Sequence, residues 1–384
     1  MESSVLAELN AEIGRGYDRI AYDPVLDASL DLERLLGLSV LFGGTPPRDP
    51  DVLDFGSGTG SLLERLATQT QGRLTGVDIS AQACERAAAR CRPFGSRVNV
   101  LCRDFLALDP DTLGQFDVAC HIGVLYVLPP ALRAEVLRLL GRCLKPGGAL
   151  VISYYTGAFH AARAALHRSV REAVSPGEAG IPAARAHIEA MAQALPPAGP
   201  LRDMLLAVMR TTQELPDTVF FHEVLNGRFD TLETAQLDSA LSPFGVGFAG
   251  WLDPLAQPPG STPRERAVAA DALDYAAARY RHAVFVRMDA GARPDVARPA
   301  WRSCCVAAAP SAEGRRYQLR GQDVHLTVHQ PRAAAVLDAL AQGPLPWESI
   351  VAAWGHGAPE SALRAGLESL WRGGAIAPLW PRQG

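Results

Sequence analysis

The sequence predicts an α/β fold in which a mostly parallel sheet carries helices on both faces. Short apolar segments alternate with helical patterns over residues 51–157, and this alternation is typical of parallel strands joined by helical crossovers. The first apolar segment runs directly into a glycine-rich turn, and acidic residues end the segments that follow it. At 384 residues, the chain is long enough for more than one domain.

The first predicted strand and its turn lie in Asp51-Val-Leu-Asp-Phe-Gly-Ser-Gly-Thr-Gly60, and a predicted helix over 61–67 follows. Glycines at such a turn let backbone N–H groups at a helix N-terminus approach a ligand. A dinucleotide fingerprint needs a third glycine at position 61, where this chain has Ser61. Asp54, just before the turn, suits an ammonium group better than a pyrophosphate. The turn therefore favours an amino-acid nucleoside, S-adenosylmethionine (SAM), over a dinucleotide.

Two further acids end the next predicted strands. Asp78 ends the strand at 73–78, where a carboxylate accepts hydrogen bonds from ribose hydroxyls. Asp104 and Phe105 end the strand at 98–105, and such a pair suits the amino group and ring face of adenine. Either acid alone is commonly a helix cap or a turn residue. Because all of these acids fall at carboxyl ends of predicted strands, where open α/β sheets bind ligands, their joint pattern predicts a SAM site.

The rest of the sheet follows after a long helical stretch at about 158–214. The last strand is expected to insert antiparallel, so that residues 231–288 complete the sheet and residues 158–230 are an insertion beside the open edge of the site. Such an insertion serves either as a lid and substrate wall or as a structural cap. The remaining predicted elements are helices at 81–90, 130–143, 231–241 and 264–280 and strands at 116–123, 144–153, 245–252 and 282–288.

The first 50 residues are a predicted helical segment over the SAM site. They hold Tyr17 and Tyr22 and an amphipathic helix at 30–41. An aromatic ring face stabilises a nearby cation by ~0.5–2 kcal/mol, so both tyrosines are candidate contacts of the sulfonium. The alternative is that the two rings anchor a helix to the core.

Residues 289–314, rich in Ala, Pro and Arg, are a predicted linker to a small domain at 315–384. That domain reads as a hairpin with Gly321 at its turn, helices at 331–341, 347–354 and 359–371 and a last strand at 375–379, which suggests a winged-helix-like module. DNA-binding modules need a clustered basic face, whereas the third helix alternates acids and arginines. We therefore expect packing against the rest of the chain, or a protein partner, rather than DNA.

Composition excludes several classes. A net charge of −4 argues against nucleic acid or an anionic membrane as partner. The sequence shows neither a leader-like start nor an apolar run long enough to cross a bilayer. Its 7 cysteines form no C-x-x-C, and no His or Cys pattern suggests a metal. We expect a cytoplasmic protein with reduced thiols and no metal.

Three motifs carry a resemblance to the class I SAM-dependent methyltransferases: Asp54-Phe-Gly-Ser-Gly-Thr-Gly60, Gly76-Val-Asp-Ile-Ser80 and Leu144-Lys-Pro-Gly-Gly148. The resemblance implies a Rossmann-like methyltransferase sheet and a set of cofactor contacts. The residues implied are the turn Gly56, Ser57, Gly58 and Gly60 for the methionine part, Asp54 for the ammonium group, Asp78 for the ribose, Ile79 beneath the adenine, and Asp104 with Phe105 at the adenine edge.

Looser motifs resemble bacterial methyltransferases with a methyltransferase regulatory domain, the group of the rickettsial-type protein lysine methyltransferases. Tyr155 stands where that group tends to have Asn, and Ile122 interrupts its usual His-Gly-Val, so the resemblance does not fix the acceptor. The motifs are Tyr17-Asp-Arg-Ile-Ala-Tyr22, His121-Ile-Gly-Val-Leu-Tyr-Val-Leu-Pro129, Ser153-Tyr-Tyr-Thr156, Phe221-His-Glu-Val-Leu-Asn226 and Arg279-Tyr-Arg-His-Ala-Val-Phe285.

Methyl transfer is an in-line displacement at a carbon that the sulfonium already activates. The protein mainly positions the acceptor and removes a proton from it when the acceptor is protonated. His121, at the end of the fourth strand, is a candidate base or backbone-positioning residue and also a candidate cofactor contact; a hydrogen-bonded structural role is the alternative. Tyr126, Tyr154 and Tyr155 are candidates for the methyl channel. The neighbours His222 and Glu223 suggest a dyad, although adjacent side chains usually point to different faces.

The sequence thus predicts a SAM-dependent methyltransferase acting on a protein side chain or a small molecule. Two alternatives stay open: an enzyme of the same fold with non-methyl chemistry at the sulfonium, and a non-catalytic SAM-binding interaction protein.

Overall fold

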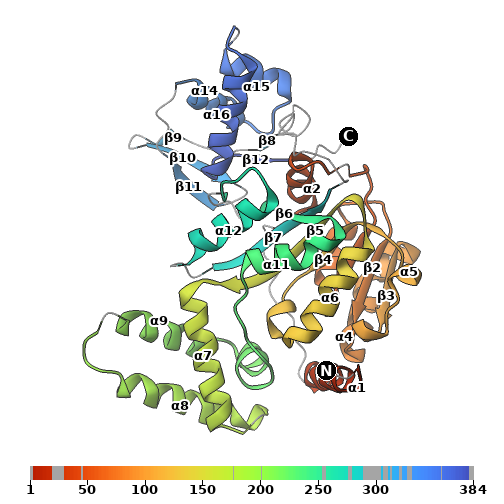
Figure 1. Cartoon of the computed structure of the whole chain (residues 1–384), viewed down its shortest axis with the longest axis vertical. Helices are drawn as coiled ribbons and strands as arrows, with labels where there is room; N and C mark the ends of the chain where they lie inside the picture. Colours follow the sequence, from red (N-terminus) through yellow and green to blue (C-terminus); the bar gives the residue numbers. More distant parts are fainter. Residues whose placement is uncertain are drawn as a thin grey trace.

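The computed structural model describes most of the chain, with a seven-stranded sheet at its centre (Figure 1). The described residues are 3–19, 30–44, 46–175, 177–199, 201–252, 257–275, 279–288, 304–305, 310–311, 314–319, 322–326, 331–355 and 357–379.

The sheet has the strand order β3-β2-β1-β4-β5-β7-β6. Its first five strands in the chain run parallel, and β7 inserts antiparallel between β5 and β6, as the sequence predicts. The strand order reverses between β1 and β4, and open sheets of this kind bind ligands at that reversal. The strands are β1 Val52–Phe55, β2 Leu74–Asp78, β3 Val98–Cys102, β4 Phe116–His121, β5 Leu144–Thr156, β6 Val246–Trp251 and β7 Arg279–Arg287.

The strands are apolar because both faces of the sheet are covered. Along β4, Val118 and Cys120 belong to one apolar cluster and Ala119 to the other, which is the alternation of a strand buried on both sides. The helices that flank the sheet are α2 Leu32–Leu41, α3 Ser61–Ala67, α4 Ala81–Cys91, α5 Pro110–Leu113, α6 Pro130–Cys143, α11 Thr234–Leu241 and α12 Pro263–Asp274.

One predicted boundary near the end of the sheet is wrong. The expected helix over 264–280 ends at Asp274, and β7 already begins at Arg279. Tyr280 pairs with Tyr155 in the ladder between β7 and β5. The ion pair of Arg281 with Asp274 links the start of the strand to the end of the helix. Sheet pairing therefore overrides the helical pattern of the sequence there.

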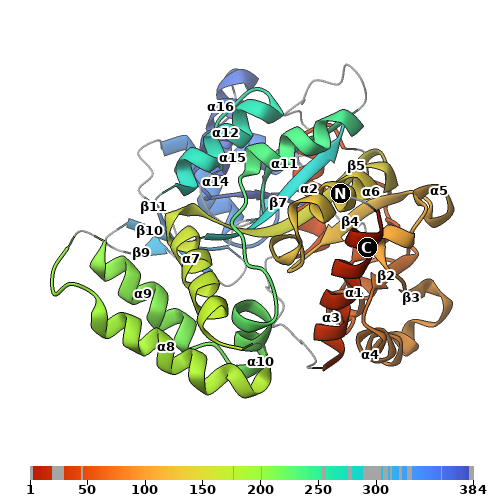
Figure 2. The same cartoon turned by 60° about the horizontal axis from the view of Figure 1, so that its bottom comes forward.

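The insertion after β5 is helical, as predicted, and has an apolar cluster of its own. It consists of α7 Gly157–Ala173, α8 Ile181–Ala194, α9 Arg202–Gln213 and the short α10 Asp217–Phe220. A π-helical turn, Phe221–Leu225, follows α10 directly. Figure 2 shows these helices as a separate layer beside the sheet.

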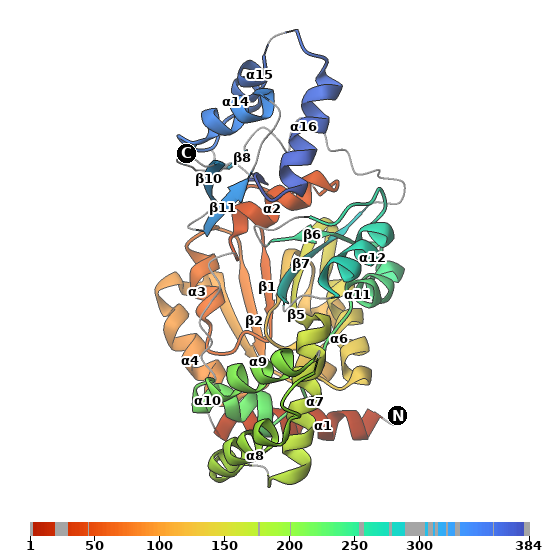
Figure 3. The same ribbon diagram turned by 90° about the vertical axis from the view of Figure 1, so that its left-hand side faces the viewer.

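The two ends of the molecule carry different elements (Figure 3). Helix α1, Ser3–Arg19, and the insertion lie at one end. The C-terminal helices lie at the other end and share an apolar cluster with α2. The C-terminal elements are β8 Cys304–Cys305, β9 Pro310–Ser311, β10 Gly314–Leu319, β11 Gln322–Leu326, α14 Pro331–Leu340, α15 Trp347–Trp354, α16 Glu360–Arg372 and β12 Ala377–Pro378.

These C-terminal elements contain the predicted hairpin, because β10 and β11 pair antiparallel. The predicted turn residue Gly321 lies outside the described residues. The contact with α2 is close: a Cβ added at Gly37 would lie 2.4 Å from the carbonyl oxygen of Pro378. The winged-helix-like class of this region stays a prediction.

Among the described residues, no helix combines the length and the apolar character that a bilayer-spanning segment needs. The same part of the chain shows no group of His, Cys, Asp and Glu suited to a metal ion.

Candidate functional site

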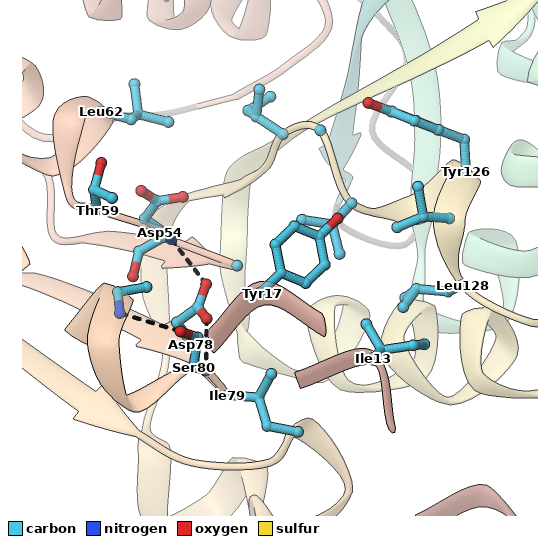
Figure 4. Close-up of a pocket in the computed structure, with 18 of the residues that line it drawn as sticks. Ile13, Tyr17, Asp54, Thr59, Leu62, Asp78, Ile79, Ser80, Tyr126 and Leu128 are labelled. Atoms are coloured by element: carbon cyan, nitrogen blue, oxygen red, sulfur yellow. Dashed lines mark hydrogen bonds between the residues drawn. The ribbon is translucent and has the colours of Figure 1, made fainter. Parts of the chain in front are cut away.

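A cavity of about 390 Å³ opens at the carboxyl ends of β1, β2 and β4 (Figure 4). We call its two walls the turn side and the insertion side. The turn side comprises Asp54, Gly56, Ser57, Gly58, Asp78, Ile79 and Phe105. The insertion side comprises Tyr126, Tyr155, Arg163, Glu223 and Tyr280.

The glycine turn after β1 needs its glycines at two positions for steric reasons. Gly56 and Gly60 have φ angles of +94° and +80°, which other residues rarely adopt. A Cβ at Gly56 would lie 2.6 Å from a methyl carbon of Val124, and one at Gly60 would lie 2.9 Å from the Cα of Ala87. Gly56 thus keeps the cavity open, whereas Gly60 lies behind the wall and lets α3 approach α4.

Asp78 holds this turn in place from the end of β2. Its Oδ2 accepts a hydrogen bond from the Gly58 N–H at 2.8 Å, and its Oδ1 accepts one from the Ser80 N–H at 2.9 Å (Figure 4). Burial raises the pKa of Asp78, while these two N–H groups oppose that rise. The carboxylate thereby joins the loops after β1 and β2 at the cavity wall.

Asp54 is a buried carboxylate that needs a partner. It is 1% exposed, and its Oδ2 has no hydrogen bond among the described residues. Burial and the nearby charge of Asp78 raise the pKa of Asp54 to about 8. An unpaired buried carboxylate is costly, so an ammonium group from a ligand would stabilise it. The site therefore fits the amino-acid end of SAM.

The predicted adenine contacts separate into two groups. Ile79 and Phe105 lie in the cavity wall, and the Phe105 ring stacks on Phe55 at 4.2 Å between centroids. Asp104 is not among the wall residues; its Oδ1 accepts hydrogen bonds from the Asn10 side chain and from the Leu106 N–H. Asp104 thus holds Asn10 of α1, which does line the cavity.

The structure places His121 beneath the site rather than in it. The residue is fully buried and outside the cavity wall, with its Nδ1 2.6 Å from the carbonyl oxygen of Phe55. Burial lowers its pKa to about 4, so the ring is neutral near pH 7. This geometry is that of the hydrogen-bonded structural histidine, and it fixes the backbone just before Gly56. A role as proton acceptor does not fit this position.

Helix α1 covers the cavity through Tyr17. The Tyr17 ring lies in the cavity and stacks on His222 with centroids 4.5 Å apart. Burial and the charges of Asp78 and Glu223 raise its pKa. Next to it, Asp18 accepts a hydrogen bond from the Ser80 hydroxyl at 2.6 Å. The other tyrosine predicted for this role, Tyr22, lies outside the described residues.

The insertion side is rich in tyrosine rings. Tyr155 lies 4.9 Å from Tyr126 and 4.6 Å from Tyr280 between ring centroids. Tyr154, the neighbour of Tyr155 on β5, points to the opposite face and bonds to Thr234, as strand alternation requires. Tyr126 and Tyr155 therefore fit the predicted channel, whereas Tyr154 does not.

Two charged residues of the insertion side form a pair that the sequence pattern does not indicate. Arg163 of α7 forms an ion pair with Glu223 of the π-helical turn, and both side chains line the cavity. His222 turns away toward Tyr17, so His222 and Glu223 form no dyad. No local motif joins Arg163 to Glu223, because the fold brings together residues that are distant in the chain.

Comparisons with known proteins agree with the fold described above. Residues 52–148 match a family model described as a methyltransferase domain. Over 144 residues the chain is 35% identical to a carboxy-S-adenosyl-L-methionine synthase of Wolinella succinogenes, covering 35% of this chain and 59% of the relative. Over 161 residues it is 32% identical to a 27-O-demethylrifamycin SV methyltransferase of Amycolatopsis mediterranei, covering 37% and 57%. The chain thus spans less than two thirds of each relative's length.

Among solved structures, PKMT2 from Rickettsia typhi superposes with a TM-score of 0.69 and 16% identity, over 93% of this chain and 77% of that one. At this identity the likeness shows the fold alone. It covers the insertion and the C-terminal elements in addition to the sheet.

Proposed function

We propose that this chain, whose residues 52–148 form a SAM-dependent methyltransferase domain on a class I methyltransferase fold, transfers the methyl group of SAM to an acceptor that enters along the insertion side. The family match over residues 52–148, described as a methyltransferase domain, supports SAM as the cofactor. The acceptor is the part of the function that rests on the geometry of the cavity.

The observation that carries the proposal is the contrast between the two walls of one cavity. On the turn side, Asp54 can pair with an ammonium group, and Asp78 can accept hydrogen bonds from ribose hydroxyls. The insertion side adds tyrosine rings and one ion pair that the nucleoside does not need. Binding alone would require only the first wall, and two walls around one cavity allow a cofactor and an acceptor to meet.

On this proposal the main predicted contacts that line the cavity have defined roles. Asp54 binds the ammonium group of the cofactor, and the backbone at Gly56 and Gly58 approaches its methionine part. Asp78 accepts hydrogen bonds from the ribose hydroxyls. Ile79 and Phe105 pack against the adenine. Tyr17 covers the cofactor from α1. When bound, SAM supplies a methyl group activated by the sulfonium; the residues of the chain orient it and keep water out.

The size of the cavity limits the acceptor. Pockets of about 300–1,000 Å³ hold one drug-sized ligand, and the volume here is about 390 Å³. With the cofactor in place, little room is left. The acceptor therefore presents a slim group, such as a single side chain or one end of a small molecule.

The test is transfer of labelled methyl from SAM into a cell extract, followed by separation of proteins from small molecules. We expect label in an acceptor with the natural protein and much less with Asp78→Ala at the same SAM concentration. Equal label in both samples would contradict the proposal. SAM binding without any transfer would favour the non-catalytic alternative.

A second candidate, chemistry that modifies SAM itself, is supported by the similarity to the Wolinella carboxy-S-adenosyl-L-methionine synthase. The same experiment separates the two candidates. Methyl transfer moves the label out of the nucleoside pool, whereas modification of SAM keeps it there in a product of changed mass.

A further inference from the structure

Arg163 and Glu223 form a buried ion pair at the insertion side of the cavity. Their side chains are 9% and 6% exposed, and an Arg163 Nη2–H donates to Glu223 Oε2. Burying two charges costs more free energy than packing apolar groups of the same size. The elements around the pair already have an apolar cluster of their own, so the pair is not needed to fill this region.

Arg163 is held from several directions. Its Nε–H donates to His167 Nε2 at 3.4 Å, and its guanidinium lies 4.9 Å from the Phe229 ring and 5.4 Å from the Tyr155 ring. Such rings stabilise a cation. The guanidinium is therefore fixed by the protein, and Glu223 is the member of the pair with spare capacity to bind.

Glu223 has one oxygen to offer. Oε2 accepts from Arg163, and the hydrogen bonds among the described residues include none to Oε1. An ionised carboxylate can accept hydrogen bonds but cannot donate them. The ligand group that meets Glu223 is therefore a donor.

The backbone conformation around Glu223 is unusual. It lies in the π-helical turn Phe221–Leu225, and such turns are frequent at functional sites. The turn directs His222 onto Tyr17 and Glu223 into the cavity. Tyr17, Asp78 and Glu223 all line the same cavity. Glu223 thus faces the cavity in which the turn side is proposed to bind the cofactor.

We propose that Glu223 accepts the proton of a protonated nitrogen acceptor and that Arg163 is its positioning residue; this inference rests on the proposed function. The N–H proton passes to Glu223 Oε1, and the freed lone pair forms the N–CH₃ bond. The C–S bond breaks with its electron pair left on sulfur. The proton then leaves Glu223 for water, so atoms and charge balance.

The surroundings of Glu223 suit this task. Burial raises its pKa, and the charge and hydrogen bond of Arg163 oppose that rise, so the carboxylate is more basic than an exposed one while it stays paired. The titratable or charged groups that contact Glu223 or its turn, or interact with Glu223 electrostatically, are Tyr17, Tyr155, Arg163, His167, Arg171 and His222.

The experiment needs no identified acceptor. It compares by calorimetry the affinities of S-adenosylhomocysteine and of the SAM analogue in which CH–NH₃⁺ replaces the methylsulfonium. The analogue carries an ammonium group where the methyl group would be, and a charge-assisted hydrogen bond to Glu223 favours it by ~10-fold or more. We expect Glu223→Gln to lose this preference and to bind S-adenosylhomocysteine within about twofold of the natural protein.

A matched control is Asp274→Asn, because Asp274 forms a buried ion pair with Arg281 but does not line the cavity. It should keep the preference for the ammonium analogue. If Glu223→Gln does not fold, Glu223→Asp keeps the charge and moves the oxygen back, and the preference should fall there too. A preference that survives in the folded Glu223 variants overturns the inference. Failure of the natural protein to bind S-adenosylhomocysteine would instead count against the proposed function.

Discussion

The two walls of the cavity are built in different ways. The turn side comes from the loops after β1, β2 and β3, and its main contacts, such as Asp78 with Gly58, join neighbouring loops of one sheet. The insertion side comes from β5, α7, β7, the π-helical turn and the segment after β4 that holds Tyr126. Its contacts join residues far apart in the chain, such as Arg163 and Glu223. The first wall is set by local turn chemistry, and the second depends on how the insertion packs.

The largest effect should follow from Gly60→Val, which tests whether the turn side depends on its backbone. The new side chain meets Ala87 of α4 at a φ of +80°, so α3 and α4 cannot keep their spacing. We expect no detectable binding of S-adenosylhomocysteine by calorimetry and a lower Tm. Gly114→Val is the control, because a Cβ at Gly114 meets nothing within 4 Å although its φ is +91°. Equal binding losses in both variants would mean that left-handed strain alone is responsible.

A smaller effect is expected from Asp78→Ala, which removes the bridge between the two loops. Two backbone N–H groups lose their acceptor, and the ribose hydroxyls lose theirs. Loss of charge-assisted hydrogen bonds of this kind costs ~1.5–3 kcal/mol each, so affinity for S-adenosylhomocysteine should fall ~100-fold. Affinity within threefold of the natural value would show that the nucleoside binds elsewhere.

The sequence predicts the turn side better than the insertion side, because the turn side depends on local turn chemistry and the insertion side on long-range packing. The sequence correctly predicts the helix at 61–67 and the turn before it, because glycine spacing and an apolar strand are local signals. Asp104 and His121 sit at strand ends as expected, but neither lines the cavity. Strand position fixes where a backbone ends; the direction of a side chain depends on its neighbours, here Asn10 and Phe55.

The sequence predicts a helical wall on the insertion side, with Tyr126 and Tyr155 among the candidates for the methyl channel. The breaks between its helices were visible as Pro and Gly, but the pairing of Arg163 with Glu223 depends on tertiary packing that leaves no periodic trace. The sequence places Tyr280 at the end of a predicted helix, because the local pattern there is helical. In the structure, Tyr280 instead belongs to β7 and pairs with β5. Long-range contacts of this kind override local propensity.

Asp54 gives a more moderate, pH-dependent effect that sharpens the description of the turn side. Its pKa is about 8 in the unliganded fold and 3.8 ordinarily, so the folded state keeps a proton that the unfolded chain loses between these values. Stability therefore falls as pH rises through this window, by up to ~1.4 kcal/mol per pH unit from this one group. Binding an ammonium group at pH 7 should release close to one proton.

Calorimetry in buffers of different ionisation enthalpy measures that release. Asp54→Asn should abolish it, flatten the dependence of the free energy of unfolding on pH and weaken binding of S-adenosylhomocysteine by ~10-fold. A natural protein that binds without releasing a proton would show that the carboxylate is already ionised or is not the ammonium site.

The smallest effect on nucleoside binding should come from Tyr280→Phe on the insertion side. The Tyr280 hydroxyl bonds to Ser153 at 2.6 Å, and the Gly123 N–H donates to the same serine oxygen at 2.7 Å. Removing the Tyr280 hydroxyl leaves the hydrogen bond between Gly123 and Ser153 in place, so the free energy of unfolding should fall by only ~1 kcal/mol. Affinity for S-adenosylhomocysteine should stay within about twofold, because the turn side is untouched. A large loss of nucleoside affinity would mean that the Ser153–Gly123 contact transmits strain to the loop after β4, and that the two walls are not independent.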